Sequence, residues 1–500
     1  MSNQYLLAID VGTTNTKAML FGTDGSQACL ASRRHSVVCR EDGWAEHDAE
    51  EVWWKEVCKV CREISESGID VSKIAAVAVS ALSPAMVPVD ADGIALYPAM
   101  LYGLDRRAFR EIEELREKYR DKVGSLLDKQ VSHLSTGPKI LWLKRNEPEI
   151  FQKASWFIGV PSYIVHHLTG VMVADYACYN IAGIPFSLSK FDWDDEMCAD
   201  CGVTRENMPP LKFSGEVAGT ITAQAAQQTG LPEGIPVAVG TGDFPAECCG
   251  YGTEYGQRLR IGLGTTLSIG QSNHMGDPVF PDYDPAHPRT GKRGGATSNG
   301  CSTIDWTINI LSGPGGERLS NETLERMAAD SPAGANGLIM LPYLNGEKAP
   351  FVDLHAKGLL FGLQRRHTSA DIYRASLEAA AFSIRHLLDG SLDGVTTAAV
   401  VGGGVNIPGF VQTISNVMGM KLEILDIKNA SLTGGAFLAG MACGIFKNRE
   451  DINSWIHVSS LVEPNLSLKE LYDKKYMMYR RLYEANSPFM HESSSTSNYE

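Results

Sequence analysis

The sequence contains no run of about 18 apolar residues, the length that a membrane-spanning helix needs, so we expect no membrane span. Its first residues, MSNQYLLAID, lack a basic stretch followed by a long apolar one, and no signal peptide is predicted. Basic residues are in the minority, since 45 Lys and Arg stand against 59 Asp and Glu, a formal net charge of −14. This balance argues against nucleic acid or an anionic membrane as a partner, because either would need a basic face.

Cysteine gives no sign of a disulfide framework. The 11 cysteines are odd in number and scattered, which is typical of reduced thiols and predicts a cytoplasmic protein. Two Cys-x-x-Cys pairs, Cys58 with Cys61 and Cys198 with Cys201, have spacing that a four-cysteine zinc site would use. The first pair falls on a predicted helix, so we expect buried thiols rather than zinc ligands.

The composition is that of an ordinary soluble α/β protein, with 44% apolar residues, 21% charged residues and 49 glycines in 500 residues. A chain of this length buries a sizeable core without disulfides. Its length fits two large domains as well as three small ones.

A strand, a Gly/Thr loop and a second strand occur twice. Alternation and turn residues predict this unit at Tyr5–Val11, Gly12-Thr13-Thr14 and Thr16–Gly22, and again at Arg258–Leu263, Gly264-Thr265-Thr266 and Leu267–Gln271. The repetition predicts two related domains with a boundary near residues 245–255.

Further elements follow from periodicity and breakers. We predict strands at Ala28–Ser36, Ile74–Val79, Met86–Asp90, Ile235–Val239 and Thr397–Val401, and helices at 48–65, over most of 106–169, and at 408–419 and 466–484. The polar tail HESSSTSNYE, from His491, is predicted to be disordered.

The first Gly/Thr loop has the composition of a phosphate-binding loop. Gly12 lets the backbone approach a phosphate closely, and the hydroxyls of Thr13 and Thr14 add donors. Asp10, at the end of the preceding strand, could hold Mg²⁺ through water, because magnesium prefers oxygen ligands and keeps part of its hydration shell. For a single loop of this kind, a plain hairpin turn is the alternative interpretation. The second loop at Gly264 and the glycines at 402–404 make that alternative weaker.

In these loops and in further motifs, the sequence resembles the FGGY carbohydrate kinases, within the superfamily of actin, hexokinase and heat-shock-chaperone ATPases. The resemblance rests on DVGTTNTKAMLF from Asp10, GWAEHDAEEVWW from Gly43, PKILWLKRNEP from Pro138, GTGDFPAECCGYG from Gly240 and GLLFGLQRRHTSADIYRASLEAAAF from Gly358. It implies an α/β fold with two actin-like (ribonuclease H-like) domains and an interdomain cleft that takes ATP and a sugar. On that basis the domains are expected at 1–248 and 249–455, with a terminal helix and tail at 456–500.

The resemblance also implies roles for single residues. Asp243 is the expected general base, since a carboxylate can accept the proton of a sugar hydroxyl that attacks the γ-phosphorus. Asp10 is the implied magnesium-positioning acid, so the cofactors are ATP and Mg²⁺. The implied phosphate-binding residues are Gly12, Thr13, Thr14, Lys17, Gly264, Thr265 and Thr266, and the implied adenosine-binding residues are Gly300, Trp306, Gly403, Gly404 and Asn406. Gln412 also matches the pattern, and Asn416 stands where the family usually has aspartate.

On the sugar side the sequence is most similar to the xylulokinases of this family, with two departures. Ser83 and Pro84 occupy the place of a Met-His pair, and Tyr102 to Arg107 alter a Trp-x-Asp-x-Arg stretch. We therefore expect a small sugar or polyol as the acceptor, in contact with Ser83, Pro84, Tyr102, Asp105 and Asp243. Among these acceptors, the resemblance favours a xylulose-like ketose. Ribulose, fuculose, gluconate, glycerol and erythritol types remain open, as does an actin-like ATPase or sensor that uses no sugar. The oligomeric state also stays open, a homodimer included.

Overall fold

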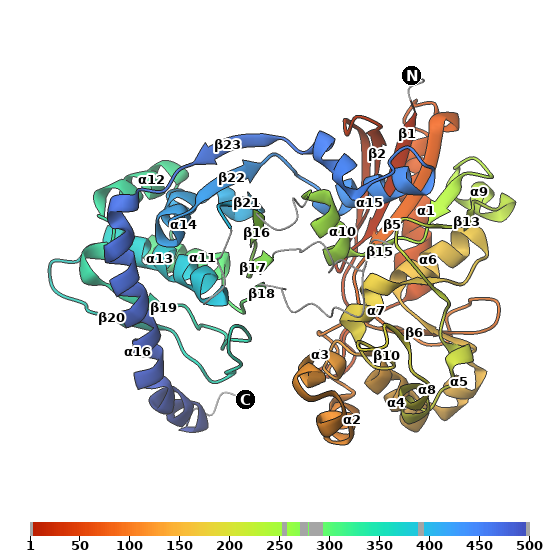
Figure 1. Ribbon diagram of the computed structural model, residues 1–500, viewed down its shortest axis with the longest axis horizontal. Helices are drawn as coiled ribbons and strands as arrows, with labels where there is room; N and C mark the ends of the chain where they lie inside the picture. Colours follow the sequence, from red (N-terminus) through yellow and green to blue (C-terminus); the bar gives the residue numbers. More distant parts are fainter. Residues whose placement is uncertain (1–3, 253–257, 271–278, 280–293, 389–394, 497–500) are drawn as a thin grey trace. The chain divides into compact units, whose positions relative to one another are not determined.

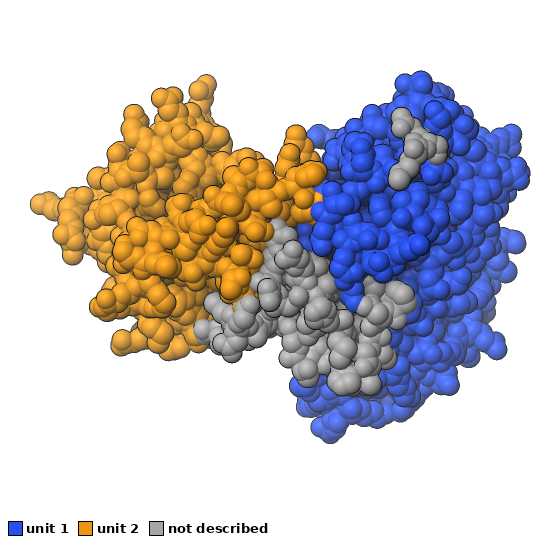
Figure 2. Space-filling model, turned by 45° about the horizontal axis from the view of Figure 1, so that its top comes forward, with its two compact units in different colours: residues 1–252, 275–290, 429–455 blue, residues 253–274, 291–428, 456–500 orange. Residues whose placement is uncertain are grey.

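A computed structural model describes residues 4–252, 258–270, 279, 294–388 and 395–496 of the chain (Figure 1). It forms two compact units, shown in two colours in Figure 2. Unit 1 takes residues 1–252, 275–290 and 429–455, and unit 2 takes residues 253–274, 291–428 and 456–500.

Unit 1 is built on a seven-stranded mixed sheet with β1 (Tyr5–Val11) near its centre. β1 pairs antiparallel with β2 and parallel with β5, so its backbone is bonded on both sides. Almost every residue of β1 is buried, because helices cover both faces of the sheet. The strand order is β13 (Val217–Thr220), β14 (Pro236–Ala238), β5 (Ile74–Ala81), β1, β2 (Asn15–Gly22) and β3 (Gln27–Arg34), and β15 (Thr241–Gly242) also pairs with β5.

The two faces of β1 are covered by helices that differ in kind. Leu7, Ile9 and Val11 share a hydrophobic core with α1 (Lys55–Ser65). On the other face lies α15 (Ala430–Ala442), whose glycines allow a close approach: a Cβ at Gly435 would lie 3.3 Å from the Cβ of Ala8. Small side chains on α15 thus bring its backbone close to the strand that ends at the first loop.

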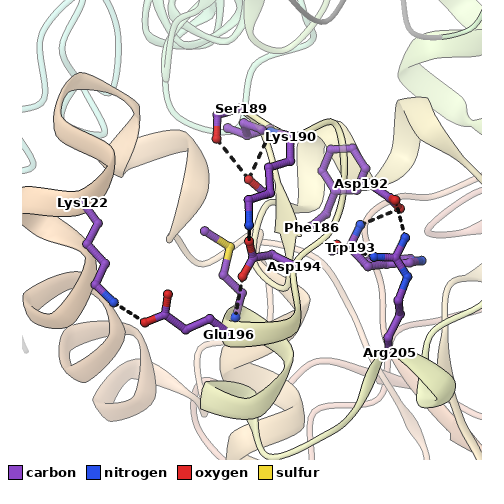
Figure 3. A network of polar contacts seen from close by, with 12 residues as sticks. Lys122, Phe186, Ser189, Lys190, Asp192, Trp193, Asp194, Glu196 and Arg205 are labelled. Carbon is purple, nitrogen blue, oxygen red and sulfur yellow. Dashed lines mark hydrogen bonds and ion pairs between the residues drawn. The ribbon is translucent and has the colours of Figure 1, made fainter.

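A second hydrophobic core in unit 1 is formed mainly by helices between residues 100 and 210. Its main elements are α2 (Phe109–Val123), α4 (Thr136–Asn146), α7 (Tyr176–Ala182) and α8 (Asp195–Cys201). Asp194 caps α8 by accepting a 2.9 Å hydrogen bond from the Met197 amide. Figure 3 shows the polar contacts around this cap, in which Lys190 pairs with Asp194 and Lys122 with Glu196.

The remaining elements of unit 1 are short. Its other helices are α3 (Leu127–Gln130), α5 (Pro148–Lys153), α6 (Val160–Thr169), α9 (Ala223–Thr229) and α10 (Asp243–Gly250). Two-stranded pairs are made by β4 (Glu46–His47) with β7 (Ala99–Met100), β6 (Val87–Val89) with β8 (Trp156–Ile158), β9 (Ala174–Asp175) with β12 (Leu211–Lys212), and β10 (Phe186–Ser187) with β11 (Asp192–Trp193).

Unit 2 repeats the central strand order of unit 1. In both, one strand is parallel to the first strand of a three-stranded antiparallel meander, and a further strand is parallel to that added strand. The described strands run β18 (Gly294–Ala296), β17 (Leu267–Gly270), β16 (Arg258–Leu263), β21 (Thr397–Val401), β22 (Lys421–Leu425) and β23 (Val458–Val462). A separate pair is β19 (Ile339–Leu341) with β20 (Leu359–Phe361), and the helices are α11 (Cys301–Ser312), α12 (Asn321–Asp330), α13 (Ser369–Leu387), α14 (Phe410–Met418) and α16 (Lys469–Thr496).

Most predicted strands coincide with observed ones to within two residues, but the tail was predicted wrongly. We expected a helix at 466–484 and disorder from His491, whereas α16 continues to Thr496. Met490 is buried in the core of unit 2, and His491 makes a 2.8 Å contact with Asp353. These contacts stabilise the polar end of the helix; residues 497–500 lie outside the described part.

The assignment of residues 249–455 to one continuous domain also differs from the observed units. Residues 429–455, including α15, belong to unit 1. The reason is tertiary packing: α15 lies against β1 and α10, and the Trp455 indole donates a 3.2 Å hydrogen bond to the Thr23 carbonyl. Within the described residues, no helix is both long enough and apolar enough to cross a membrane.

Candidate active site

The first Gly/Thr loop is a tight turn between β1 and β2. The Gly12 amide donates to the Asn15 carbonyl at 2.8 Å, which closes the turn. The hydroxyls of Thr13 and Tyr102 are 3.0 Å apart and form a hydrogen bond. The structure therefore brings Tyr102, a predicted sugar-side residue, against a predicted phosphate-binding residue.

Asp10 lies at the end of β1, directly before this loop, and is only 7% exposed. The Ser80 hydroxyl, on the neighbouring strand β5, donates a 2.7 Å hydrogen bond to Asp10 Oδ1. Burial raises the pKa of Asp10, while Ser80, the positive charge of Lys17 and Ser431 on α15 lower it. Three separate segments of the chain thus surround this carboxylate.

Asp243 is the first residue of α10 and follows β15 directly. The side chain is half-buried, and its Oδ1 accepts a 2.7 Å hydrogen bond from the Phe244 amide. Burial raises the pKa of Asp243 to about 7, with a further contribution from the negative charge of Asp10. A carboxyl group that titrates near neutral pH is suited to accepting a proton during catalysis.

Close helix packing positions α10. A Cβ at Gly434 of α15 would lie 1.9 Å from the Ala246 carbonyl oxygen, and one at Gly250 would lie 2.1 Å from that of Ala430. Only glycine permits these approaches, so the α10–α15 contact fixes where α10 begins. It brings Asp243 at the start of α10 and Ser431 at the start of α15 toward Asp10.

A buried carboxylate also holds the segment before Asp243. Asp175, at the N-terminus of α7, accepts a 2.7 Å hydrogen bond from the Thr241 hydroxyl and a 3.1 Å hydrogen bond from the Cys178 amide. Burial raises the pKa of Asp175, and these hydrogen bonds lower it. Sequence reasoning missed Asp175, Ser80 and Ser431, because only tertiary contacts connect them to Asp10 or Asp243, and it assigned no role to Thr241; the small-residue pattern of α15 is the one local signal.

The predicted sugar-binding residues divide into accessible and buried ones. Ser83 is half-buried and lies beside the Asp243 segment, since a Cβ at Gly242 would be 2.8 Å from the Ser83 Cβ. Pro84 is buried and lines a cavity of about 10 Å³, together with Asp175 and Cys178. That volume holds about one water molecule, and the contact of Pro84 with a sugar stays a prediction.

Asp105 is committed to a buried ion pair. It is 3% exposed, and its carboxylate accepts hydrogen bonds from the Arg107 side chain, at 2.6 Å from Nη2, and from the Ala45 amide at 2.9 Å. Arg107 also pairs with Glu46 at 2.8 Å and lies over the Trp44 ring, 3.8 Å from its centroid. The direct contact of Asp105 with the sugar stays a prediction; in the structure, Arg107 and the Ala45 amide hold its carboxylate in place.

Unit 2 contains a cavity of about 470 Å³, within the range of small-molecule sites. Five predicted nucleotide-binding residues line it: Gly264, Thr265, Gly403, Gly404 and Asn406. The second Gly/Thr loop is fixed by the start of α11, because the Cys301 and Ser302 amides donate to the Gly264 and Thr265 carbonyls, each at 3.2 Å.

The other predicted nucleotide-site residues lie outside the lining of this cavity. Gly300 packs against the loop from behind, since a Cβ there would be 2.7 Å from the backbone of Thr266 and Leu267. Trp306 is 45% exposed on α11. Gln412 donates to Asn416 and to the Glu463 carbonyl, both at 3.0 Å, so this pair holds the chain after β23.

The two Cys-x-x-Cys pairs pack separately. Cys61 belongs to the core around α1, and Cys198 and Cys201 belong to the core around α8. Burial raises the pKa of all of these thiols, as it does that of Cys58. In the described part of the chain, no group of three or more His, Cys, Asp or Glu residues has the arrangement of a metal site.

Models of the FGGY family of carbohydrate kinases match the chain twice: the N-terminal domain at residues 5–250 and the C-terminal domain at residues 281–443. The chain is 25% identical to a xylulose kinase of Bacillus subtilis, over 96% of this chain and 97% of the relative. It is 27% identical to glycerol kinase 2 of Thermotoga maritima, over 94% and 97%.

Among solved structures, the xylulose kinase of Rhodospirillum rubrum is similar with a TM-score of 0.86 and 28% identity, over 98% of this chain and all of that one. A gluconate kinase of Lactobacillus acidophilus has a TM-score of 0.85 at 23% identity, over 97% and 98%, and shares the fold. The relatives are phosphotransferases that act on alcohol groups of small sugars or polyols, and the fold is their two-domain actin-like one. The chain is therefore a member of the FGGY family of carbohydrate kinases, and a kinase itself.

Proposed function

We propose that this kinase transfers the γ-phosphoryl group of ATP to a hydroxyl of a small sugar or polyol, with Asp243 as the general base. One observation carries the proposal: burial and the negative charge of Asp10 raise the pKa of the half-buried Asp243 carboxyl group to about 7. Such a group is largely deprotonated above neutral pH and basic enough to take a hydroxyl proton.

In the proposed reaction, the acceptor oxygen attacks the γ-phosphorus as its proton moves to Asp243. The bond from that phosphorus to the bridging oxygen of ADP breaks, and ADP leaves with the electron pair. The loops at Gly12–Thr14 and Gly264–Thr266 supply hydroxyl and amide donors for phosphate oxygens, and Lys17 adds a positive charge. The cavity lined by Gly403, Gly404 and Asn406 is the proposed adenosine site.

Asp10 fits a role in positioning magnesium. Its carboxylate is a hard oxygen donor, and one of its oxygens is held by Ser80 at 2.7 Å. Because Asp10 is nearly buried and no cluster of three acidic or imidazole ligands surrounds it within the described residues, it suits a hydrated ion held through water. Mg²⁺ bound with ATP would neutralise charge on the β- and γ-phosphates.

For the acceptor, we propose a xylulose-like ketose first. The 25–28% identity to xylulose kinases over nearly the whole chain supports it, while similar identity to glycerol kinases keeps polyols among the candidates. The altered residues Ser83 and Tyr102 lie close to Asp243 and Thr13, which supports a pocket that differs from that of the relatives.

The test is an assay of ADP production with ketopentoses, ketohexoses, polyols and aldonates, using the wild type and the Asp243→Asn variant. We expect ADP release to depend on one acceptor class and to be lost in the variant. ADP release that is independent of every acceptor would instead favour an actin-like ATPase. Full acceptor-dependent turnover in the variant would exclude Asp243 as the base.

A further inference from the structure

A buried histidine lies beneath the first Gly/Thr loop. His35 directly follows β3, and its side chain is only 4% exposed. Its Nε2 is 3.0 Å from the Gly12 carbonyl oxygen, and its Nδ1 is 2.9 Å from Glu56 Oε2 on α1. The His35 amide also donates a 3.0 Å hydrogen bond to the Thr14 carbonyl. One residue therefore holds the loop at two points.

The partners of the ring determine its protonation. A carbonyl oxygen and a carboxylate only accept hydrogen bonds, whereas a neutral imidazole has a single N–H. Both contacts are hydrogen bonds either when both ring nitrogens carry protons and Glu56 is ionised, or when the ring is neutral and Glu56 is protonated. Because a glutamate side chain is ordinarily ionised at neutral pH, we take His35 as an imidazolium ion paired with the Glu56 carboxylate.

The neighbouring histidine is in the opposite state. The Trp53 indole, which can only donate, gives a 3.1 Å hydrogen bond to His47 Nδ1, so that nitrogen is unprotonated. The His47 ring lies edge-on to that of His35, with 4.9 Å between centroids. Burial lowers the pKa of His47 to about 4, and the charge of His35 adds to this effect. One ring of the pair is thus charged and the other neutral.

We propose that His35, as an imidazolium paired with Glu56, is a positioning residue of the nucleotide site. It fixes the Gly12 and Thr14 carbonyls and so the conformation of the loop, and it adds a positive charge behind the loop that attracts phosphate. The proposal rests on the proposed function, because it takes this loop to bind nucleotide phosphates.

The same pair of elements provides a matched control. Arg33 on β3 pairs with Glu63 on α1, as His35 pairs with Glu56, but both partners are about 40% exposed, and Arg33 lies opposite Thr16 of β2 rather than opposite the loop. Glu63→Gln therefore removes a β3–α1 ion pair without changing the loop. Any effect common to Glu56→Gln and Glu63→Gln reflects the attachment of α1 to the sheet.

The experiment measures nucleotide affinity by equilibrium titration with ADP and ATP, and kcat and both KM values by ADP production, for the full chain and its His35→Gln, Glu56→Gln and Glu63→Gln variants. Losing a hydrogen bond to a charged group corresponds to roughly 10-fold in affinity or more. We expect that loss in nucleotide Kd and in KM for ATP for the first two variants, with KM for the sugar unchanged. Glu63→Gln should match the wild type.

A spectroscopic readout tests the charge independently of activity. In protein labelled with ¹⁵N-histidine, the signals lost in His35→Gln identify this ring, and we expect two nearly equal shifts of protonated nitrogens. One protonated and one unprotonated nitrogen would overturn the assignment as imidazolium. Normal nucleotide affinity in His35→Gln would overturn the positioning role while leaving the proposed function intact, whereas a wild type that binds no nucleotide would overturn both.

Discussion

The negative charge of Asp10 acts on Asp243 and, together with burial, raises the Asp243 pKa to about 7. The two residues come from the end of β1 and the start of α10, which the contact between α10 and α15 brings together. Because of this coupling, the pH dependence of kcat should reflect both the pKa of Asp243 and the charge of Asp10.

Replacing Asp243 by Asn should lower kcat by at least about 100-fold, as expected for loss of a general base. The same change should stabilise the fold at neutral pH. The folded-state pKa lies above the usual 3.8, so this group's contribution to stability is present below pH 4 and is lost as the pH rises to about 7. Asparagine does not titrate, so the melting temperature of the variant should exceed that of the wild type at pH 8 but not at pH 4. A lower melting temperature at pH 8 would contradict the raised pKa.

The wild-type kcat should fall about tenfold per pH unit below roughly pH 7, where Asp243 becomes protonated. In Asp10→Asn the acid limb should move to lower pH, because a neighbouring negative charge is removed, although burial will keep it above pH 4. Glu247→Gln, which removes a weaker contribution, should shift the limb less. Identical limbs in all three proteins would show that Asp10 does not affect Asp243.

Gly403→Val and Gly404→Val should have different effects. A Cβ at Gly403 meets nothing within 4 Å, so the valine side chain would extend into free space at the cavity and raise KM for ATP with little change in melting temperature. A Cβ at Gly404 would lie 2.6 Å from Leu263 and Cys301, so that variant should lose stability instead. Kinetics and thermal unfolding of both variants separate the two effects.

Gly434→Ala should displace α10 and with it Asp243, and should lower kcat by more than tenfold. A shift of about 1 Å between a base and the hydroxyl that it deprotonates lowers the rate on the order of 100-fold. Gly435→Ala is the matched control: both changes improve helix propensity equally, but its Cβ would be 3.3 Å from Ala8 rather than 1.9 Å from a backbone oxygen. Equal activity in the two variants would mean that the helix contact does not position Asp243.

Ser83→Met should change the ranking of acceptors in the substrate panel. Ser83 lies beside Gly242, so a long thioether would extend next to Asp243, where the reacting hydroxyl is proposed to bind. Pro84→His should mainly destabilise the protein, because the cavity at that side chain has about 10 Å³ of free volume. A panel with an unaltered ranking for Ser83→Met would place the sugar pocket elsewhere.

The sequence by itself determined the strands, the two Gly/Thr loops and the family, because alternation, turn residues and motifs are local properties. It also located Asp10 and Asp243, which end or follow buried strands. Tertiary structure alone decided that α15 belongs to unit 1, that Asp105 forms a buried ion pair with Arg107, and that α16 continues to Thr496. These outcomes depend on glycine contacts between distant helices, on ion pairs formed after burial, and on a core that holds Met490, none of which a local pattern encodes.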